Sequence, residues 1–232
     1  MVVEKSAFAQ AVVVNSGIAN ACTGKPGMDC CQAEAEHAGN LLGIPTDAVL
    51  VASTGVIGMQ MPVERLCAGI DKLVAAKEAS LEAGLDAAKA IMTTDTVHKQ
   101  IAVEVELGGK TVTIGGMCKG SGMTHPNMCT MLGFVTTDAN ISKEMLQKCV
   151  SASVEDSFNM ISVDGDTSTN DTLLVLANGL AGNEEITTEG ADYAVFSEAL
   201  NYITTYLAKK MAGDGEGATA LFECQVVGAD TK

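Results

Sequence analysis

Apolar and polar positions along this chain follow two periods, which predict strands and helices in turn. Short apolar runs predict buried strands over residues 8–14 and 48–54. Residues 101–107 and 111–118 alternate between apolar and polar, and Gly108-Gly109 between them predicts a two-residue hairpin turn. Further short strands are predicted over residues 131–135, 160–163, 173–177 and 219–227.

Helical spacing predicts the elements that cover these strands. It favours helices over residues 29–42, 62–92, 142–157 and 193–211, with a break in the second near Gly84 and an N-cap at Ser142 for the third. Two apolar stripes lie at this spacing and are expected to face a core, namely Val63, Leu66, Ile70, Leu73 and Val74, and Phe196, Leu200, Ile203, Leu207 and Met211. The pattern therefore predicts a mixed α/β (α+β) fold with helices covering sheets.

Composition narrows the classes of protein. The 232 residues are 47% hydrophobic and evenly mixed, which predicts a globular domain rather than a disordered chain or a membrane span. A net charge of −15 disfavours nucleic acid and anionic membranes as partners, because both are bound through clustered Lys and Arg. Glu4 and Lys5 precede the first apolar run, so the start does not resemble a signal peptide and the protein is expected in the cytoplasm.

The residues that could bind a metal are scattered. The eight cysteines include no Cys-x-x-Cys pair, and the three histidines stand far apart, so buried free thiols in a reducing compartment are expected. Asp164, Asp166 and Ser168 have the spacing of a calcium loop, but Thr169 replaces the required glycine and Val175 replaces the bidentate glutamate. No metal is predicted there.

Residues 119–135 hold the strongest candidate chemistry. They read Lys-Gly-Ser-Gly-Met-Thr-His-Pro-Asn-Met-Cys-Thr-Met-Leu-Gly-Phe-Val, a glycine-rich turn that leads into a predicted strand with Thr130 at the boundary. A hydroxyl in this position suits self-cleaving enzymes, in which it attacks the preceding peptide bond and the freed α-amine then becomes its base. The plainer interpretation is a tight turn before a core strand.

Resemblance to a known family changes this balance. The stretch 119–132 resembles the cleavage segment of the ornithine acetyltransferases, the bifunctional glutamate N-acetyltransferases of arginine biosynthesis. Further segments resemble that family's signatures in the family's order, namely residues 15–24, 53–58, 92–96, 163–171 and 214–219. The resemblance implies a four-layer α/β/β/α sandwich of the DmpA/ornithine acetyltransferase superfamily, formed by a single domain over 1–232.

The same resemblance implies the site and its chemistry. The Cys129–Thr130 bond would be cleaved to give fragments 1–129 and 130–232, and Thr130 would carry the acetyl group from N-acetylornithine to glutamate by a ping-pong mechanism. Thr54 and Gly55 would hold the oxyanion, and Thr93, Lys119, Thr130 and Glu216 would bind substrate. No metal or nucleotide cofactor is implied, acetyl-CoA is a possible co-substrate, and the family assembles as heterotetramers of two α and two β chains.

Several features depart from the family's pattern. Cys129 stands where the family usually has alanine, and Ala220 stands where it usually has lysine. Family members are also expected to extend beyond both ends of this chain, as for a truncated protein. Two alternatives therefore stay open: an aminopeptidase-like hydrolase with the same nucleophile, and an inactive fragment. The role of the loop at 164–171 is not predicted.

Overall fold

The computed structural model describes residues 8–123 and 131–229. Its strands are β1 (Ala11–Ile18), β2 (Val49–Val56), β3 (Lys99–Leu107), β4 (Lys110–Lys119), β5 (Leu132–Thr137) and β6 (Thr172–Ala177). Its α-helices are α2 (Gly24–Leu42), α3 (Val63–Ala76), α4 (Leu81–Ala90), α5 (Lys143–Glu155) and α6 (Ala191–Gly213), and two 3₁₀ turns, η1 (Thr46–Ala48) and η2 (Phe158–Met160), complete the set.

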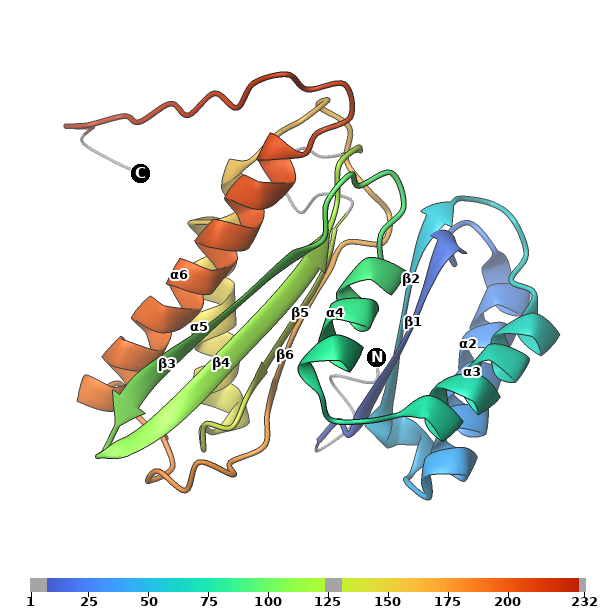
Figure 1. Ribbon diagram of the computed structural model, residues 1–232, viewed down its shortest axis with the longest axis horizontal. Helices are drawn as coiled ribbons and strands as arrows, with labels where there is room; N and C mark the ends of the chain where they lie inside the picture. Colours follow the sequence, from blue (N-terminus) through green and yellow to red (C-terminus); the bar gives the residue numbers. More distant parts are fainter. Residues whose placement is uncertain (1–7, 124–130, 230–232) are drawn as a thin grey trace.

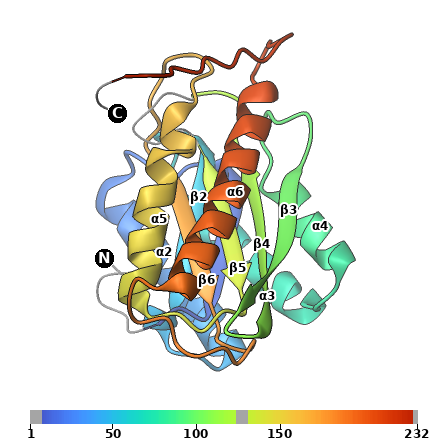
Figure 2. The same ribbon diagram turned by 90° about the vertical axis from the view of Figure 1, so that its left-hand side faces the viewer.

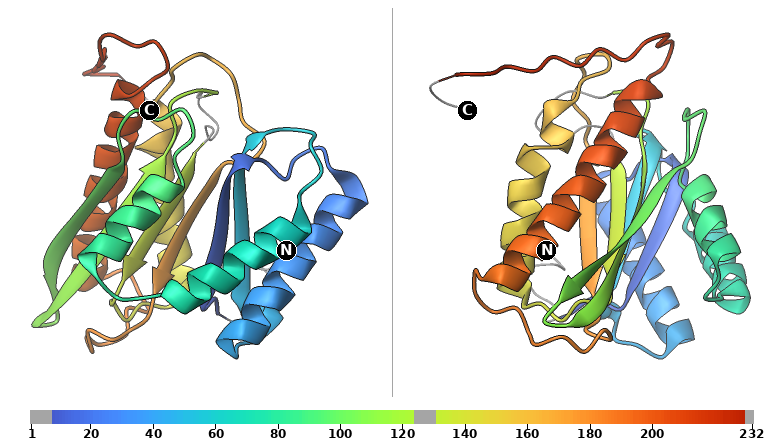
Figure 3. Two further views of the ribbon diagram at one scale, coloured as in Figure 1. Left: turned by 45° about the vertical axis from the view of Figure 1, so that its right-hand side comes forward. Right: turned by 60° about the vertical axis from the view of Figure 1, so that its left-hand side comes forward.

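The elements form four layers. Strands β1 and β2 make a parallel pair, while the second sheet has the order β3-β4-β5-β6 with only β5 and β6 parallel. The two sheets face each other, α2 and α3 cover the outer face of the first, and α5 and α6 cover the outer face of the second (Figure 1). Seen from the side, α5 and α6 lie over the second sheet (Figure 2), and the right-hand view of Figure 3 shows α4 at the edge of the sandwich. This arrangement confirms the expected α/β/β/α sandwich.

Three apolar cores hold the layers together. The largest fills the space between the second sheet and its helices, and the predicted stripe on α6 lies at its centre: Phe196, Leu200, Ile203, Leu207 and Met211 are all fully buried. A smaller core joins α2 and α3 to the first sheet around Val49 and Ile70. The third lies between the sheets and contains Ala52, Leu132 and Phe134, so it fixes one sheet relative to the other.

Local signals fixed several elements as predicted. The hairpin of β3 and β4 turns at Gly108 and Gly109, whose φ angles of 56° and 74° are those that a tight hairpin of this type needs. Ser142 caps α5, since its Oγ accepts the backbone N–H of Met145 at 3.3 Å. These choices depend on neighbouring residues alone, which explains why the sequence predicts them.

Other boundaries were predicted wrongly. β1 continues through the expected turn at Asn15 to Ile18, and α2 begins at Gly24, five residues before the predicted start. The break between α3 and α4 is not at Gly84 but before Ser80, whose hydroxyl accepts the N–H of Ala83 and starts a new helix. On α3, Leu73 is 64% exposed, so it does not share the buried face of Ile70.

Two predicted strands do not form in the described residues. Residues 160–163 contain the end of a 3₁₀ turn and an irregular segment. Residues 219–227 alternate in sequence but run as an extended segment beyond α6, where no described strand pairs with them (Figure 1). Phe222 and Val227 are more than 80% exposed there. Alternation describes a half-buried strand only when a neighbouring strand supplies hydrogen bonds, and here none does.

The cysteines and the helix lengths can also be compared with the class of protein that the composition predicts. All cysteines in the described residues are free, and Cys30, Cys118 and Cys149 are buried as expected, whereas Cys22 and Cys224 are exposed. Among the described residues, no helix has both the length and the apolar character to cross a membrane.

Candidate active site

Near its end, β2 carries a buried threonine, Thr54, followed by a glycine, Gly55. Any other residue in place of Gly55 would displace the neighbouring backbone. Thr54 is 2% exposed, and Gly55 has a φ of 129°. Gly55 lies opposite Gly17 of β1, and a Cβ at Gly55 would stand 2.3 Å from the Gly17 carbonyl carbon. The backbone of β1 therefore approaches too closely for any side chain, and only glycine fits this conformation.

The end of β4 supplies a buried lysine. Lys119 is the last residue of the strand and is 2% exposed, and its Nζ lies 3.9 Å from Oδ2 of Asp95. Burial lowers the pKa of Lys119 and nearby Lys99 adds to this effect, while the negative charges of Asp95 and Glu216 oppose it. The outcome is a pKa below the ordinary value of a lysine.

Asp95 links the segments around this lysine. Its side chain is fully buried and accepts the backbone N–H of Gly120 at 2.7 Å and the ammonium of Lys99 at 2.7 Å through Oδ1. Its Oδ2 accepts the backbone N–H of Thr93 at 3.2 Å. Burial by itself would raise the pKa of Asp95, but these hydrogen bonds outweigh it and the pKa is lowered, so the group is a carboxylate at neutral pH.

Two further segments reach the same place. Thr94 Oγ1 lies 2.6 Å from Oγ of Ser121, which joins the loop after α4 to the turn after β4. Glu216 follows α6, and its backbone N–H donates to the carbonyl of Ser121 at 2.7 Å. The Glu216 carboxylate lies over Gly122, because a Cβ at Gly122 would stand 2.9 Å from its Cδ.

These segments surround one open cleft of about 630 Å³. Five of the predicted site residues, Thr54, Gly55, Thr93, Lys119 and Glu216, line it although they come from four parts of the chain. The other lining residues are Ser16, Gly17, Val56, Met92, Thr94, Gly122 and Met123. A hydroxyl, a glycine with a positive φ angle, a cation and a carboxylate thus face one cavity.

The segments that line the cleft fall within the match to one family, whose sequence model covers residues 1–232. The chain belongs to the ArgJ family. It is 57% identical over 222 residues to the arginine biosynthesis bifunctional protein ArgJ of Symbiobacterium thermophilum, covering 96% of this chain and 55% of the relative. It is 54% identical over 220 residues to the ArgJ protein of Bacillus subtilis, covering 95% and 53%. The chain thus spans about half the length of the curated relatives it matches.

Two solved structures are also similar to this ArgJ-family chain. The arginine biosynthesis bifunctional protein of Bacillus halodurans is 46% identical with a TM-score of 0.48, over 52% of this chain and 61% of that one. The ornithine acetyltransferase of Mycobacterium tuberculosis, solved in complex with ornithine, is 37% identical with a TM-score of 0.43, over 50% and 61%.

The predicted nucleophile and cleavage site of this ArgJ-family chain, Thr130 and Cys129, lie outside the described residues. Met131, the residue that follows Thr130, is described. It is followed by Leu132, which pairs with Lys119 at the end of β4 nearest the cleft. The chain therefore enters β5 from the side of the cleft.

The loop at 164–171, whose role the sequence did not predict, contacts both residues that flank the undescribed segment. Asp171 Oδ1 accepts the backbone N–H of Met131 at 3.0 Å, and Asp164 accepts that of Met123. Burial raises the pKa of Asp171 to about 7, although hydrogen bonds from Met131 and Ser168 and the charge of Lys119 oppose this. Among the described residues no cluster of His, Cys, Asp or Glu could hold a metal ion.

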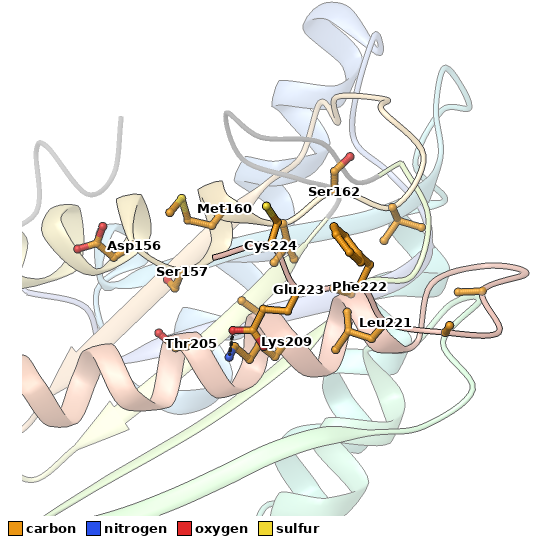
Figure 4. Close-up of a pocket in the computed structure, with 16 residues that line it drawn as sticks. Asp156, Ser157, Met160, Ser162, Thr205, Lys209, Leu221, Phe222, Glu223 and Cys224 are labelled. Carbon is orange, nitrogen blue, oxygen red and sulfur yellow. Dashed lines mark hydrogen bonds and ion pairs between the residues drawn. The ribbon is translucent and has the colours of Figure 1, made fainter. Parts of the chain in front are cut away.

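A second cavity, of about 570 Å³, lies where the segment after α6 passes over α6 and the end of α5 (Figure 4). Ala220, the departure from the family's lysine, lines this cavity and not the cleft. Lys209 donates to Glu223 at 2.7 Å there, and both side chains are at least half exposed (Figure 4). An exposed pair of this kind holds the segment weakly.

Sequence reasoning missed part of the site. Ser16 and Thr94 line the cleft, and the buried Ser121 contacts Thr94. All three lie within recognised signature segments, yet nothing in their spacing marks them as part of the site. Asp95 and Lys99 could have been noticed as an acid and a base four residues apart, but that spacing usually marks an exposed helical pair. Here neither residue is helical and both are buried.

Proposed function

We propose that this chain carries the acetyl-transfer site of an arginine-biosynthesis enzyme, which moves the acetyl group of N-acetylornithine to glutamate. The observation that carries the proposal is the cleft in which Thr54, Gly55, Thr93, Lys119 and Glu216 meet. Membership of the ArgJ family supports the same reaction, because the curated relatives are bifunctional proteins of arginine biosynthesis.

The cleft suits an acylated diamino acid. N-acetylornithine carries a carboxylate, which the Lys119 ammonium attracts, and an amino group on its side chain, which the Glu216 carboxylate attracts. Glutamate shares the first of these groups, so Lys119 serves both substrates. Two opposite charges that line one cavity orient such a molecule along a single direction.

Self-cleavage prepares the nucleophile in this proposal. The Thr130 hydroxyl attacks the carbonyl carbon of Cys129, the Cys129–Thr130 peptide bond breaks, and water hydrolyses the resulting ester. Fragments 1–129 and 130–232 result, and the new α-amine of Thr130 serves as its base. Asp171, which holds the N–H of the next residue, supports the orientation of this segment.

Acetyl transfer then follows in two halves. The Thr130 oxygen attacks the acetyl carbonyl, its proton passes to the α-amine, and Thr54 and Gly55 donate hydrogen bonds to the oxyanion. The bond from the acetyl carbon to the nitrogen breaks and ornithine leaves with the proton. The amine of glutamate next attacks the acetyl ester, and N-acetylglutamate leaves while Thr130 regains its proton. Acetyl-CoA could load the same ester. The proposal also places the reaction in the cytoplasm and the cleaved chains in a heterotetramer.

The test measures mass and transfer on the same preparation. The denatured chain is expected to give two masses that meet between residues 129 and 130, and incubation with N-acetylornithine should add one acetyl group to fragment 130–232. Thr130→Ala should leave the chain whole and unacetylated, whereas Thr111→Ala, at an exposed position on β4, should match the wild type. An intact wild-type chain without acetyl-enzyme would refute the proposal, and acetyl release to water without transfer to glutamate would favour the hydrolase.

A further inference from the structure

Beside the cleft lies a buried cluster of four charges, of which the reaction above uses only Lys119 directly. Lys99, the first residue of β3, is fully buried and donates to Asp95 at 2.7 Å and to Asp214 at 2.5 Å. Asp95 in turn lies 3.9 Å from Lys119. Two carboxylates and two ammonium groups balance in charge, which is the condition under which ionised groups persist in a protein interior.

The cluster joins the three described segments that bring Thr93, Lys119 and Glu216 to the cleft. Asp95 holds the N–H of Thr93 on the loop after α4 and the N–H of Gly120 on the turn after β4. Asp214, two residues before Glu216, accepts the backbone N–H and the hydroxyl of Thr96. The side chains of Asp95 and Lys99 have no solvent exposure, so these two residues act on the cleft only through the residues that they hold.

The contact between Asp95 and Lys119 has a particular geometry. At 3.9 Å it is an ion pair and exceeds the length of a hydrogen bond, so it attracts the Lys119 ammonium without occupying its N–H donors. The oxygen atoms of Asp95 are meanwhile held by Lys99 and by two backbone N–H groups. Asp95 therefore cannot turn toward Lys119 to form a closer pair, which would remove the cation from the cleft.

We propose that Asp95, balanced by Lys99, is a positioning residue that keeps Lys119 charged and directed at a carboxylate in the cleft. The inference rests on the proposed function, because the carboxylate is that of the amino-acid substrate. Asp95 contacts no reacting atom; it acts through Lys119 and through the turn at Gly120. Loss of Asp95 weakens the capture of substrate more than the chemical step.

The first measurement reads the Lys119 charge without any need for activity. Lysine labelled with ¹³C at Cε is titrated by NMR, and the Lys119 signal is assigned from its absence in Lys119→Arg. The other titratable groups that act on Lys119 or sense its charge are Lys99, Glu216, Cys118 and Asp171. With these unchanged, Asp95→Asn should lower the Lys119 pKa by about one to three pH units.

The matched control removes a carboxylate of the same kind at the other end of β5. Asp138 Oδ1 accepts the backbone N–H of Thr113 at 2.8 Å, and Asp138→Asn should leave the Lys119 titration unmoved. Asp95→Glu should restore part of the shift. Because Asp95→Asn leaves Lys99 with one carboxylate fewer, Asp95→Asn/Lys99→Met is included as a variant that removes both charges together. An unchanged Lys119 pKa in both Asp95→Asn and Asp95→Asn/Lys99→Met overturns the proposal.

The second measurement separates substrate capture from chemistry. Asp95→Asn should raise KM for N-acetylornithine roughly tenfold to a hundredfold, with a smaller change in kcat, as expected for the loss of a charge-assisted contact. A tenfold to hundredfold fall in kcat with KM unchanged would overturn the positioning role. A wild-type chain that transfers no acetyl group would count against the proposed function alone, since the titration of Lys119 still decides the role of Asp95.

Discussion

Lys99→Met tests how much of the fold depends on the buried charge cluster. Methionine keeps the length and most of the volume of the lysine stem but removes its charge. Asp95 and Asp214, with side chains 0% and 6% exposed, would then lie together without the ammonium that bridges them. Two like charges in a buried site repel each other and have lost their counterion.

The expected loss follows from the cost of breaking a buried ion pair. Removal of one partner leaves an uncompensated charge and typically costs about 3 to 5 kcal/mol. With a urea dependence of about 2 to 3 kcal/mol per molar, the unfolding midpoint should fall by roughly 1 to 2.5 M at pH 7. Lys25→Met is the matched control: its partner Asp29 is 64% exposed, and loss of such a pair costs less than about 1 kcal/mol.

The dependence on pH distinguishes charge from packing. Burial would raise the pKa of Asp95 and Asp214, but hydrogen bonds, including those from Lys99, lower both, so each contributes stability above about pH 4 that is lost as pH falls further. Without Lys99 the pKa of each carboxylate should rise, and protonation in mild acid should relieve the repulsion. Urea unfolding at pH 7 and pH 5 should therefore show a deficit that shrinks at the lower pH. A deficit that is equal at both would refute the electrostatic account and leave only lost packing.

Two further predictions concern the cleft and the loop beside it. Gly55→Ala should destabilise the fold by about 1 to 3 kcal/mol from backbone strain, and by more because the added Cβ would collide with Gly17. Gly58→Ala is the control: Gly58 has a φ of 84° and open space around it, so this variant should show the strain alone. Equal urea midpoints for the two variants would contradict this expectation. Asp171, whose pKa burial raises to about 7, keeps a proton that the unfolded chain loses, so its contribution to stability should fall as pH rises from about 4 to 7. Asp171→Asn should remove this part of the pH dependence of unfolding, Asp166→Asn in the same loop should not, and identical profiles would count against the buried acid.

Local patterns predicted most of the elements, and the failures have physical causes. The β3–β4 hairpin depends on alternation and on two glycines within one short segment, so its residues specify it. The break between α3 and α4 depends on a competition between Gly84, which a helix tolerates, and the cap at Ser80, which begins a new one. Residues 219–227 have the pattern of a strand without a strand beside them.

Resemblance named the lining of the cleft, but the cluster behind it could not be read from the sequence. Lys99 and Asp214 are 115 positions apart, and charged residues are rarely fully buried, so each is expected to be solvated. Only the packing of α6 along β3 brings them together (Figure 1). The motifs therefore indicate candidate site residues, whereas the long-range topology determines which buried residues position them.

The geometry of the cleft also depends on packing between the two sheets, which involves residues outside the cleft. Thr54 and Gly55 belong to the first sheet, while Lys119 ends a strand of the second. The distance between the proposed oxyanion donors and the proposed carboxylate-binding cation is therefore set by the core between the sheets, where Ala52 and Phe134 pack. Because Ala52 lies two residues before Thr54 on β2, a change of volume at this interface moves the donors relative to Lys119 while every hydrogen bond within each half stays intact. The packing of two sheets thus sets the geometry of the proposed reaction.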